Sequence, residues 1–121
     1  MNQTIITLKK QEIALKFTID AWDQMENEVC TLDELDARMA SKGRLRVIAA
    51  LISILSQYSA GPALTKDEAW ALLCPANVKR ASDGIVAEVV RAMKMESEDD
   101  GDGGVVDVVL EEIEKNGNAA G

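Results

Sequence analysis

The hydrophobic positions at the start of the chain alternate with polar ones, which is the period of a β-strand. Apolar side chains recur along residues 4–8, and again at every second position along residues 13–17. The polar residues 9–12 between them have the length of a turn, so the sequence predicts two short strands joined as a hairpin. The turn contains no glycine, which leaves its type open.

From Thr18 onward the apolar positions recur every three or four residues, which is the period of a helix, and capping residues mark where helices begin. Thr18 is a predicted N-cap, and Phe17 and Trp22 occupy the two positions of a hydrophobic staple around it. Two later helices are predicted to begin with capping boxes, in which Thr31 and Thr65 are each followed three residues later by a glutamate.

The most apolar part of the chain is residues 44–58. A helix without a polar face is buried on most sides, so this segment is the predicted central helix of the core. A last helix is predicted over residues 77–95, with a kink or a break at Asp83-Gly84. Together these elements predict a mainly α fold, a compact bundle of about five helices with a short N-terminal β-hairpin, in one domain over residues 1–95.

The regular pattern stops near residue 96. Residues 96–104 contain five acidic residues and three glycines, a composition that predicts a flexible acidic linker. Beyond it, residues 105–121 are predicted to form a short amphipathic segment with a disordered end. Its apolar residues follow the spacing of one helix face: Val106, Val109, Leu110 and Ile113. This segment either packs on the body or folds on a partner, and the glycines before it favour the partner.

Charge is unevenly distributed along the chain. The formal net charge is −8, and residues 96–121 hold nine of the 21 acidic residues but only one of the 13 basic ones. The body over residues 1–95 is therefore neutral, and little attraction to nucleic acid or an anionic membrane is expected. With no leader sequence, no apolar run long enough to span a bilayer, and two distant cysteines expected to be reduced and buried, a cytoplasmic location is predicted.

The residue types that most enzymes and metal sites use are scarce. The sequence has no histidine, which is the commonest general base and metal ligand. It also lacks a glycine-rich phosphate loop, a nucleophile elbow and a Cys-x-x-Cys pair. Residues 98–103 resemble the start of a calcium loop, but Val109 then stands where a bidentate glutamate is needed. We therefore expect a protein-binding module rather than an enzyme, with no cofactor and no metal.

The two tryptophans are candidate anchors for a partner. The staple position of Trp22 favours the core, whereas Trp70 lies on a short helix between loops and fits either the core or an exposed anchor. The candidate partner-binding residues are Trp70, Val106, Val109, Leu110 and Ile113. A nearly all-apolar central helix in a body of this size also predicts weak self-association.

The order of these elements resembles that of a known family. The hairpin ends in LKFT at residues 15–18, and a helix carrying Trp22 and Met25-Glu26 follows. TLDEL at residues 31–35, the all-apolar helix, LTKDEA at residues 64–69 and IVAEVVRAM at residues 85–93 come next. In this order and in its capping residues, the stretch from 4 to 95 resembles the tail assembly chaperones of long-tailed, siphovirus-type bacteriophages and prophages, including related small proteins of gene-transfer agents.

The resemblance implies a function. Such chaperones bind the long tape measure protein in the host cytoplasm, keep it soluble, help to recruit tail tube subunits and leave before the particle is complete. This chain departs from the family pattern at the hairpin turn and at Cys74-Pro75, where similar proteins often continue in polar residues. Two alternatives remain: a permanent structural tail or connector subunit, and a small regulator that binds DNA through residues 66–73 and 77–95. The neutral body argues against DNA binding.

Overall fold

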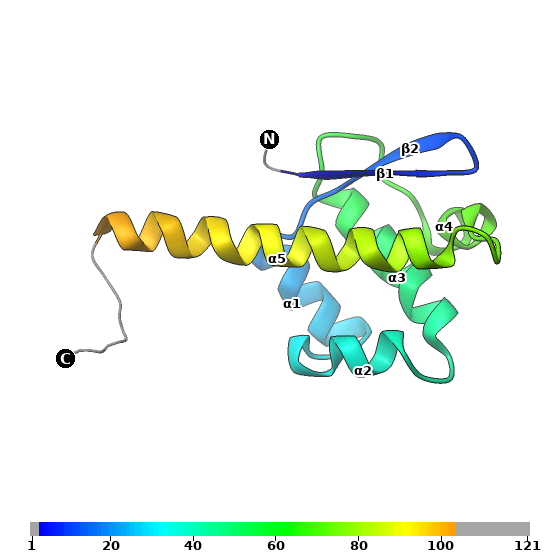
Figure 1. Cartoon of the computed structure of the whole chain (residues 1–121), viewed down its shortest axis with the longest axis horizontal. Helices are drawn as coiled ribbons and strands as arrows, with labels where there is room; N and C mark the ends of the chain where they lie inside the picture. The colour runs from blue at the N-terminus through cyan, green and yellow to red at the C-terminus, as the bar shows by residue number, and fades with distance from the viewer. Residues whose placement is uncertain (1–2, 104–121) are drawn as a thin grey trace.

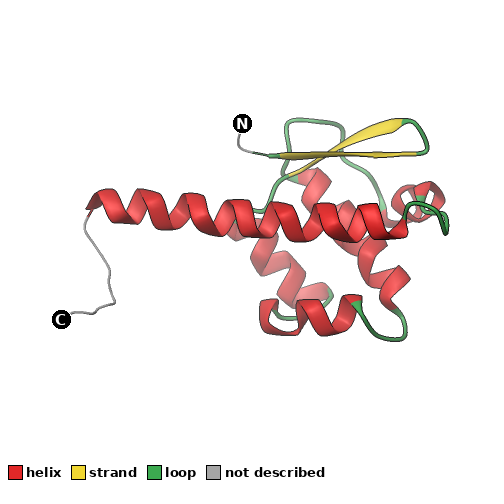
Figure 2. Ribbon diagram, viewed as in Figure 1, coloured by secondary structure: helices red, strands yellow, loops and turns green. Residues whose placement is uncertain are grey.

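The computed structural model describes residues 3–103 of the chain, and the side chains of residues 3–94. It is mainly helical with a two-stranded antiparallel hairpin at its N-terminus, as the sequence predicts (Figures 1 and 2). The elements in chain order are β1 (Thr4–Leu8), β2 (Gln11–Leu15), α1 (Ile19–Glu28), a short 3₁₀ turn (Leu32–Glu34), α2 (Leu35–Met39), α3 (Arg44–Gln57), α4 (Lys66–Leu72) and α5 (Val78–Gly103).

The hairpin turns more tightly than its sequence predicts. Leu8 pairs with Gln11, so only Lys9 and Lys10 form the turn, and the predicted turn over residues 9–12 is too long. Both lysines have positive φ, 50° and 68°, which is the conformation that matches the twist of paired strands in a two-residue turn. The ammonium of Lys9 donates a hydrogen bond to the carbonyl oxygen of Ala71 at 2.8 Å, which fastens the turn to the end of α4.

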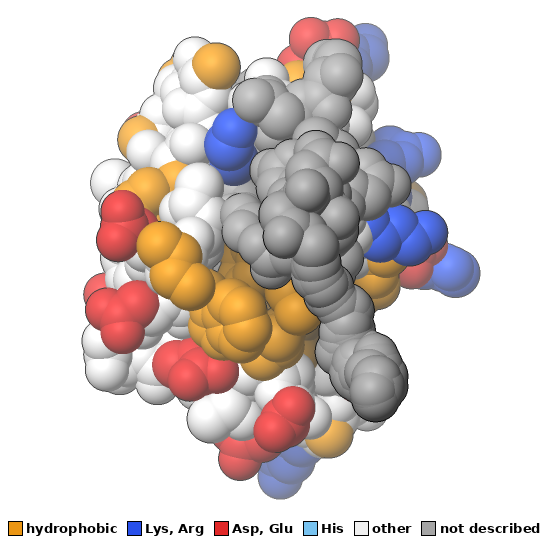
Figure 3. Space-filling view, turned by 90° about the vertical axis from the view of Figure 1, so that its left-hand side faces the viewer, with side chains coloured by type: hydrophobic (Ala, Val, Ile, Leu, Met, Phe, Trp, Pro, Cys, Tyr) orange, Lys and Arg blue, Asp and Glu red, His pale blue; other side chains and the backbone are white. Residues whose placement is uncertain are grey.

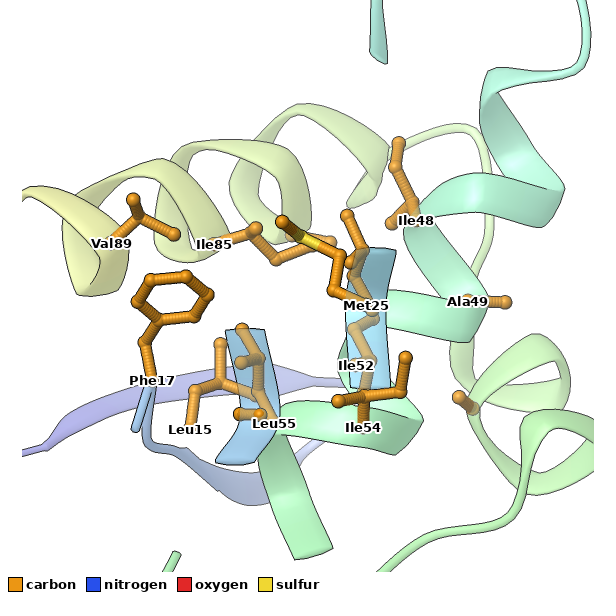
Figure 4. Packing of buried hydrophobic residues seen from close by; sticks show 14 of the residues in the cluster. Leu15, Phe17, Met25, Ile48, Ala49, Ile52, Ile54, Leu55, Ile85 and Val89 are labelled. Carbon is orange, nitrogen blue, oxygen red and sulfur yellow. The ribbon is translucent and has the colours of Figure 1, made fainter. Parts of the chain in front are cut away.

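Helix α3 is the centre of the core, as predicted. Ten consecutive residues of this helix, from 47 to 56, are buried. Figure 4 shows several of its side chains, among them those of Ile52 and Leu55, pointing toward side chains of β2, α1 and α5. The two serines on this helix also have buried partners, because Ser53 donates to the carbonyl oxygen of Leu64 and Ser56 accepts from the Leu64 amide, at 2.8 and 2.9 Å. These bonds hold the loop that leads into α4 against the central helix.

Helix α5 is continuous through Gly84, where the sequence predicts a kink or a break. The glycine has a packing role instead. A Cβ atom at this position would overlap Cγ2 of Ile6, so the missing side chain lets β1 lie directly against the helix. The glycine therefore marks a close approach between two elements that are far apart in the sequence.

Helix α5 also extends beyond the point where the regular sequence pattern stops. The helix continues through residues 96–103, which the composition predicts to be a linker. Adding residues to an established helix is much easier than starting one, because each added residue gains a hydrogen bond. As a result, α5 extends past the body on the side away from α4 (Figure 1). Residue 104 and the predicted amphipathic segment over 105–121 lie outside the described residues.

Candidate functional site

An open groove of about 680 Å³ lies where the end of α2, the start of α3, the end of α4 and the start of α5 meet. Leu45 and Trp70 are large apolar side chains that line it and remain 41% and 39% exposed. Ile48, which is fully buried, lies behind them. The other lining residues are Met39, Arg44, Leu73, Cys74, Pro75, Val78, Lys79 and Ser82. The groove is therefore an apolar depression on the surface that continues into the core.

The geometry of α4 decides which way Trp70 points. The predicted capping box is present, because Thr65 accepts from the Glu68 amide and the Glu68 carboxylate accepts from the Thr65 amide. Ala69 is fully buried against the core, so the next residue of the helix is turned by about 100° toward solvent. The guanidinium of Arg46 lies 4.0 Å from the centre of the Trp70 ring and stacks on it. Trp70 is thus an exposed side chain held in a defined position.

The charged side chains that line the groove are both basic, namely Arg44 and Lys79. Lys79 also pairs with Asp83 at 2.9 Å, but these side chains are 87% and 64% exposed. A pair this exposed contributes little and can rearrange when a partner binds. The groove therefore combines an apolar surface with positive charge at its edge.

A buried asparagine shapes the wall of the groove between α4 and α5. Asn77 is 4% exposed, and its side-chain oxygen accepts a hydrogen bond from the Cys74 amide at 2.9 Å. Its side-chain nitrogen donates to the carbonyl oxygen of Leu72, also at 2.9 Å. These bonds fix the turn that carries Cys74-Pro75. The sequence reasoning missed Asn77, although an asparagine at the start of a predicted helix is a signal for such a capping turn.

The two cysteines differ in their surroundings. Cys30 is buried as predicted, and this burial raises the pKa of its thiol. Cys74 is only half-buried, because it lies in the wall of the groove, so the prediction that both are buried is wrong for this residue. Both are free thiols.

Trp22 contrasts with Trp70. It packs against the core, and its ring stacks on Phe17 with 5.7 Å between the ring centres, which confirms the predicted staple. Its indole N–H donates to the Glu26 carboxylate at 2.8 Å, and the Leu32 amide donates to the same oxygen at 3.0 Å. The Leu32 bond and then the Trp22 bond lower the pKa of Glu26, because they stabilise its charged form. Trp22 therefore belongs to the fold and not to the groove.

The sequence reasoning also missed a fully buried carboxylate, that of Glu88 on α5. It accepts hydrogen bonds from the hydroxyl of Thr4 at 2.9 Å and from the amide of Phe17 at 2.8 Å. Nε and Nη2 of Arg91 donate to its two oxygens at 2.9 and 2.6 Å. These bonds raise the pKa of Arg91, since they stabilise the charged guanidinium. The available signal was an acidic residue within a run of apolar helix positions, followed three residues later by an arginine.

This network joins three parts of the chain that are distant in sequence: β1, the junction between β2 and α1, and α5. Four donor atoms, from Thr4, Phe17 and Arg91, bind one carboxylate that has no contact with solvent. The arrangement fits a structural role, because a satisfied buried charge holds elements in one register.

A second apolar surface lies on α5. Val86, Val90 and Met93 follow the spacing i, i+4, i+7 and are 36%, 46% and 39% exposed. Figure 3 views the side of the molecule toward which α5 extends, and it shows hydrophobic side chains gathered on this side of the molecule with acidic ones near them. None of the three residues of this stripe lines the groove.

The predicted partner-binding residues are placed only in part. Trp70 lines the groove, whereas Val106, Val109, Leu110 and Ile113 lie outside the described residues. In the described part of the chain, residues 3–103 with the side chains of 3–94, no three acidic or cysteine side chains gather as a metal site would require. No helix within this same part of the chain is both long enough and apolar enough to cross a membrane.

Comparison with family models, with curated proteins and with solved structures finds no match to this chain.

Proposed function

We propose that the chain is a tail assembly chaperone of long-tailed phages, which binds the tape measure protein and helps to recruit tail tube subunits in the host cytoplasm. The observation that carries the proposal is the groove around Trp70. An apolar groove of this kind accepts the apolar face of an amphipathic helix. The family that the sequence resembles acts on a long helical client, and the order of the capped elements supports that resemblance.

The chemistry of the groove suits recognition rather than catalysis. Its exposed apolar side chains, Leu45 and Trp70, offer surface to a helical client. The stacking of Arg46 on Trp70 orders the indole before binding, so less side-chain entropy is lost when a partner docks. Exposed aromatic residues held in this way commonly dominate the binding energy of a protein interface. The proposal therefore describes a non-enzymatic holding protein that needs no cofactor.

Co-expression tests the proposal. The probe is a long helical tape measure protein, which the proposal expects to be encoded near this gene, produced with and without the chain. We expect the chain to raise the soluble fraction of the tape measure protein and to copurify with it. Trp70→Asp should abolish both effects, because it places a negative charge in the apolar groove. Ile19→Asp is the matched control: Ile19 is 74% exposed outside the groove, and an acidic residue in the first turn of α1 is favourable.

Four outcomes would overturn the proposal or part of it. A gene neighbourhood without a long helical tape measure protein, or a tape measure protein equally insoluble with and without the chain, would contradict the chaperone function. Equal loss in Trp70→Asp and Ile19→Asp would contradict the assignment to the groove. Finding the chain at fixed stoichiometry in purified particles would replace the chaperone with a permanent tail or connector subunit.

A further inference from the structure

We propose that the Trp70 groove binds the C-terminal segment, residues 105–115, of a second copy of this chain, so that copies join head to tail. The inference goes beyond the proposed function, because it concerns the protein alone and needs no client. It rests on three observations: the apolar groove, the charges at its edge, and the distance between the groove and the end of α5.

The segment complements the groove in both polarity and charge. Its apolar residues follow the spacing of one helix face: Val106, Val109, Leu110 and Ile113. Asp107, Glu111 and Glu114 follow the spacing i, i+4, i+7 along one flank of that face. The groove offers exposed Leu45 and Trp70, with Arg44 and Lys79 as its charged lining. An acidic amphipathic helix is therefore the occupant that satisfies both the apolar surface and the basic edge.

The length of α5 places this segment out of reach of its own groove. Lys79 lines the groove, and the same helix continues to Gly103. At 1.5 Å per residue, the end of the helix lies about 36 Å from Lys79. Residues 104 and 105 span at most about 7 Å when fully extended. Figure 1 shows the end of α5 on the opposite side of the molecule from α4. The segment that enters a groove must then come from a neighbouring copy.

This geometry makes the contact heterologous. Each copy carries one segment that donates and one groove that accepts, so a dimer formed through one contact still has a free segment and a free groove. Assemblies should grow with protein concentration unless the second copy's segment enters the first copy's groove and closes a dimer. Because the contact pairs acidic and basic side chains near the surface, it should weaken as the salt concentration rises.

A complementation experiment with the full-length chain tests the inference, with sedimentation velocity as the readout. Trp70→Asp should prevent the groove from binding and leaves the C-terminal segment unchanged. Leu110→Asp should prevent the segment from binding and leaves the groove unchanged. We expect each variant alone to lose self-association by about 30-fold or more, the scale of a strong interface residue. Mixing the two variants should restore a 1:1 heterodimer, because one intact segment then meets one intact groove.

Charge-matched controls separate the contact from a general effect of added charge. Val108→Asp places the same charge on the opposite face of the segment, and Ile19→Asp places it outside the groove. Both should associate like the parent. Leu45→Asp is a second groove variant, to be used if circular dichroism shows that Trp70→Asp is unfolded. A monomeric parent at all concentrations, a mixture without heterodimer, or equal loss in Val108→Asp would each overturn the inference.

Discussion

Glu88 and Trp70 both lie where their residue types are unusual, and the protein accommodates them in opposite ways. Glu88 is a carboxylate with no exposure to solvent, and Trp70 is a large apolar side chain left 39% exposed. Charged residues are almost never fully buried unless they are paired, and Glu88 is paired with Arg91 and hydrogen-bonded to two further donors. Trp70 has Arg46 on one face and an open groove beside it.

The difference separates a structural site from a binding site. At Glu88 every interaction is made within the chain, so a change there should affect the free energy of unfolding. At Trp70 apolar surface is left uncovered, so a change there should affect binding and leave stability nearly unchanged. A buried charged residue whose hydrogen bonds are all made within the chain therefore indicates a structural role. A large apolar residue whose surface stays exposed indicates a binding site.

The largest effect is expected at Glu88. Glu88→Ala leaves the Phe17 amide without a partner and Arg91 without its counter-charge, so we expect the free energy of unfolding to fall by about 3–5 kcal/mol. Urea denaturation of the parent and the variant measures the difference. Glu88→Gln keeps the shape of the side chain and should lose less. A loss below about 1 kcal/mol for Glu88→Ala would show that the network is not structural.

The residues that line the groove also separate into those that should affect stability and those that should affect binding. Ile48 is fully buried behind it, whereas Leu45 is 41% exposed at its surface. Ile48→Ala should lower the free energy of unfolding by about 2–5 kcal/mol, as for other buried aliphatic residues. Leu45→Ala should change it by no more than about 0.5 kcal/mol while weakening binding. If Ile48→Ala melts like the parent, the assignment of α3 as the central helix is wrong.

A smaller effect is expected at Gly84. Replacing a helical glycine with alanine normally stabilises a helix by about 1 kcal/mol. Here the new Cβ would overlap Ile6, so we expect Gly84→Ala to lower the free energy of unfolding by about 1–3 kcal/mol instead. In a double-mutant cycle, Ile6→Ala should remove much of this loss because it vacates the space. A variant more stable than the parent would show that β1 moves aside easily.

The smallest effect concerns pH and Glu26. Hydrogen bonds from Leu32 and Trp22 lower the pKa of this carboxyl in the folded protein below its ordinary value of 4.5. Its contribution to stability is therefore complete above pH 4.5 and is lost as the pH falls through the lower folded-state value. Glu26→Gln should be less stable than the parent at neutral pH, and the difference should shrink in acid. A difference independent of pH would contradict the assignment. Chemical denaturation at several pH values provides the measurement.

Much of the fold could be predicted because its signals are local. The capping boxes at Thr31 and Thr65 and the staple between Phe17 and Trp22 are all present in the structure. Each involves residues within one or two turns of a helix, so the sequence pattern alone predicts the contact. The burial of α3 could be predicted for a similar reason, since a helix that is apolar on every side must be covered.

The candidate site could be predicted only in part. Trp70 was identified as a candidate anchor, but its exposure depends on the burial of Ala69 and on the stacking of Arg46. The wall formed by Cys74-Pro75 depends on the side chain of Asn77. The groove needs α2, α3, α4 and α5 together, and periodicity along a chain does not say which helices meet.

The sequence by itself therefore determined the helix starts, the central helix, the neutral body and the acidic C-terminal stretch. The tertiary structure decided the length of the hairpin turn, the continuity of α5 through Gly84, the burial of Glu88 and the exposure of Trp70. The physical reason is distance along the chain. Helix caps and amphipathic faces are interactions between neighbours, whereas the Thr4–Glu88 hydrogen bond joins residues 84 positions apart. Such a contact forms only when packing brings β1 against α5, because neither segment alone contains a reason to bury a carboxylate.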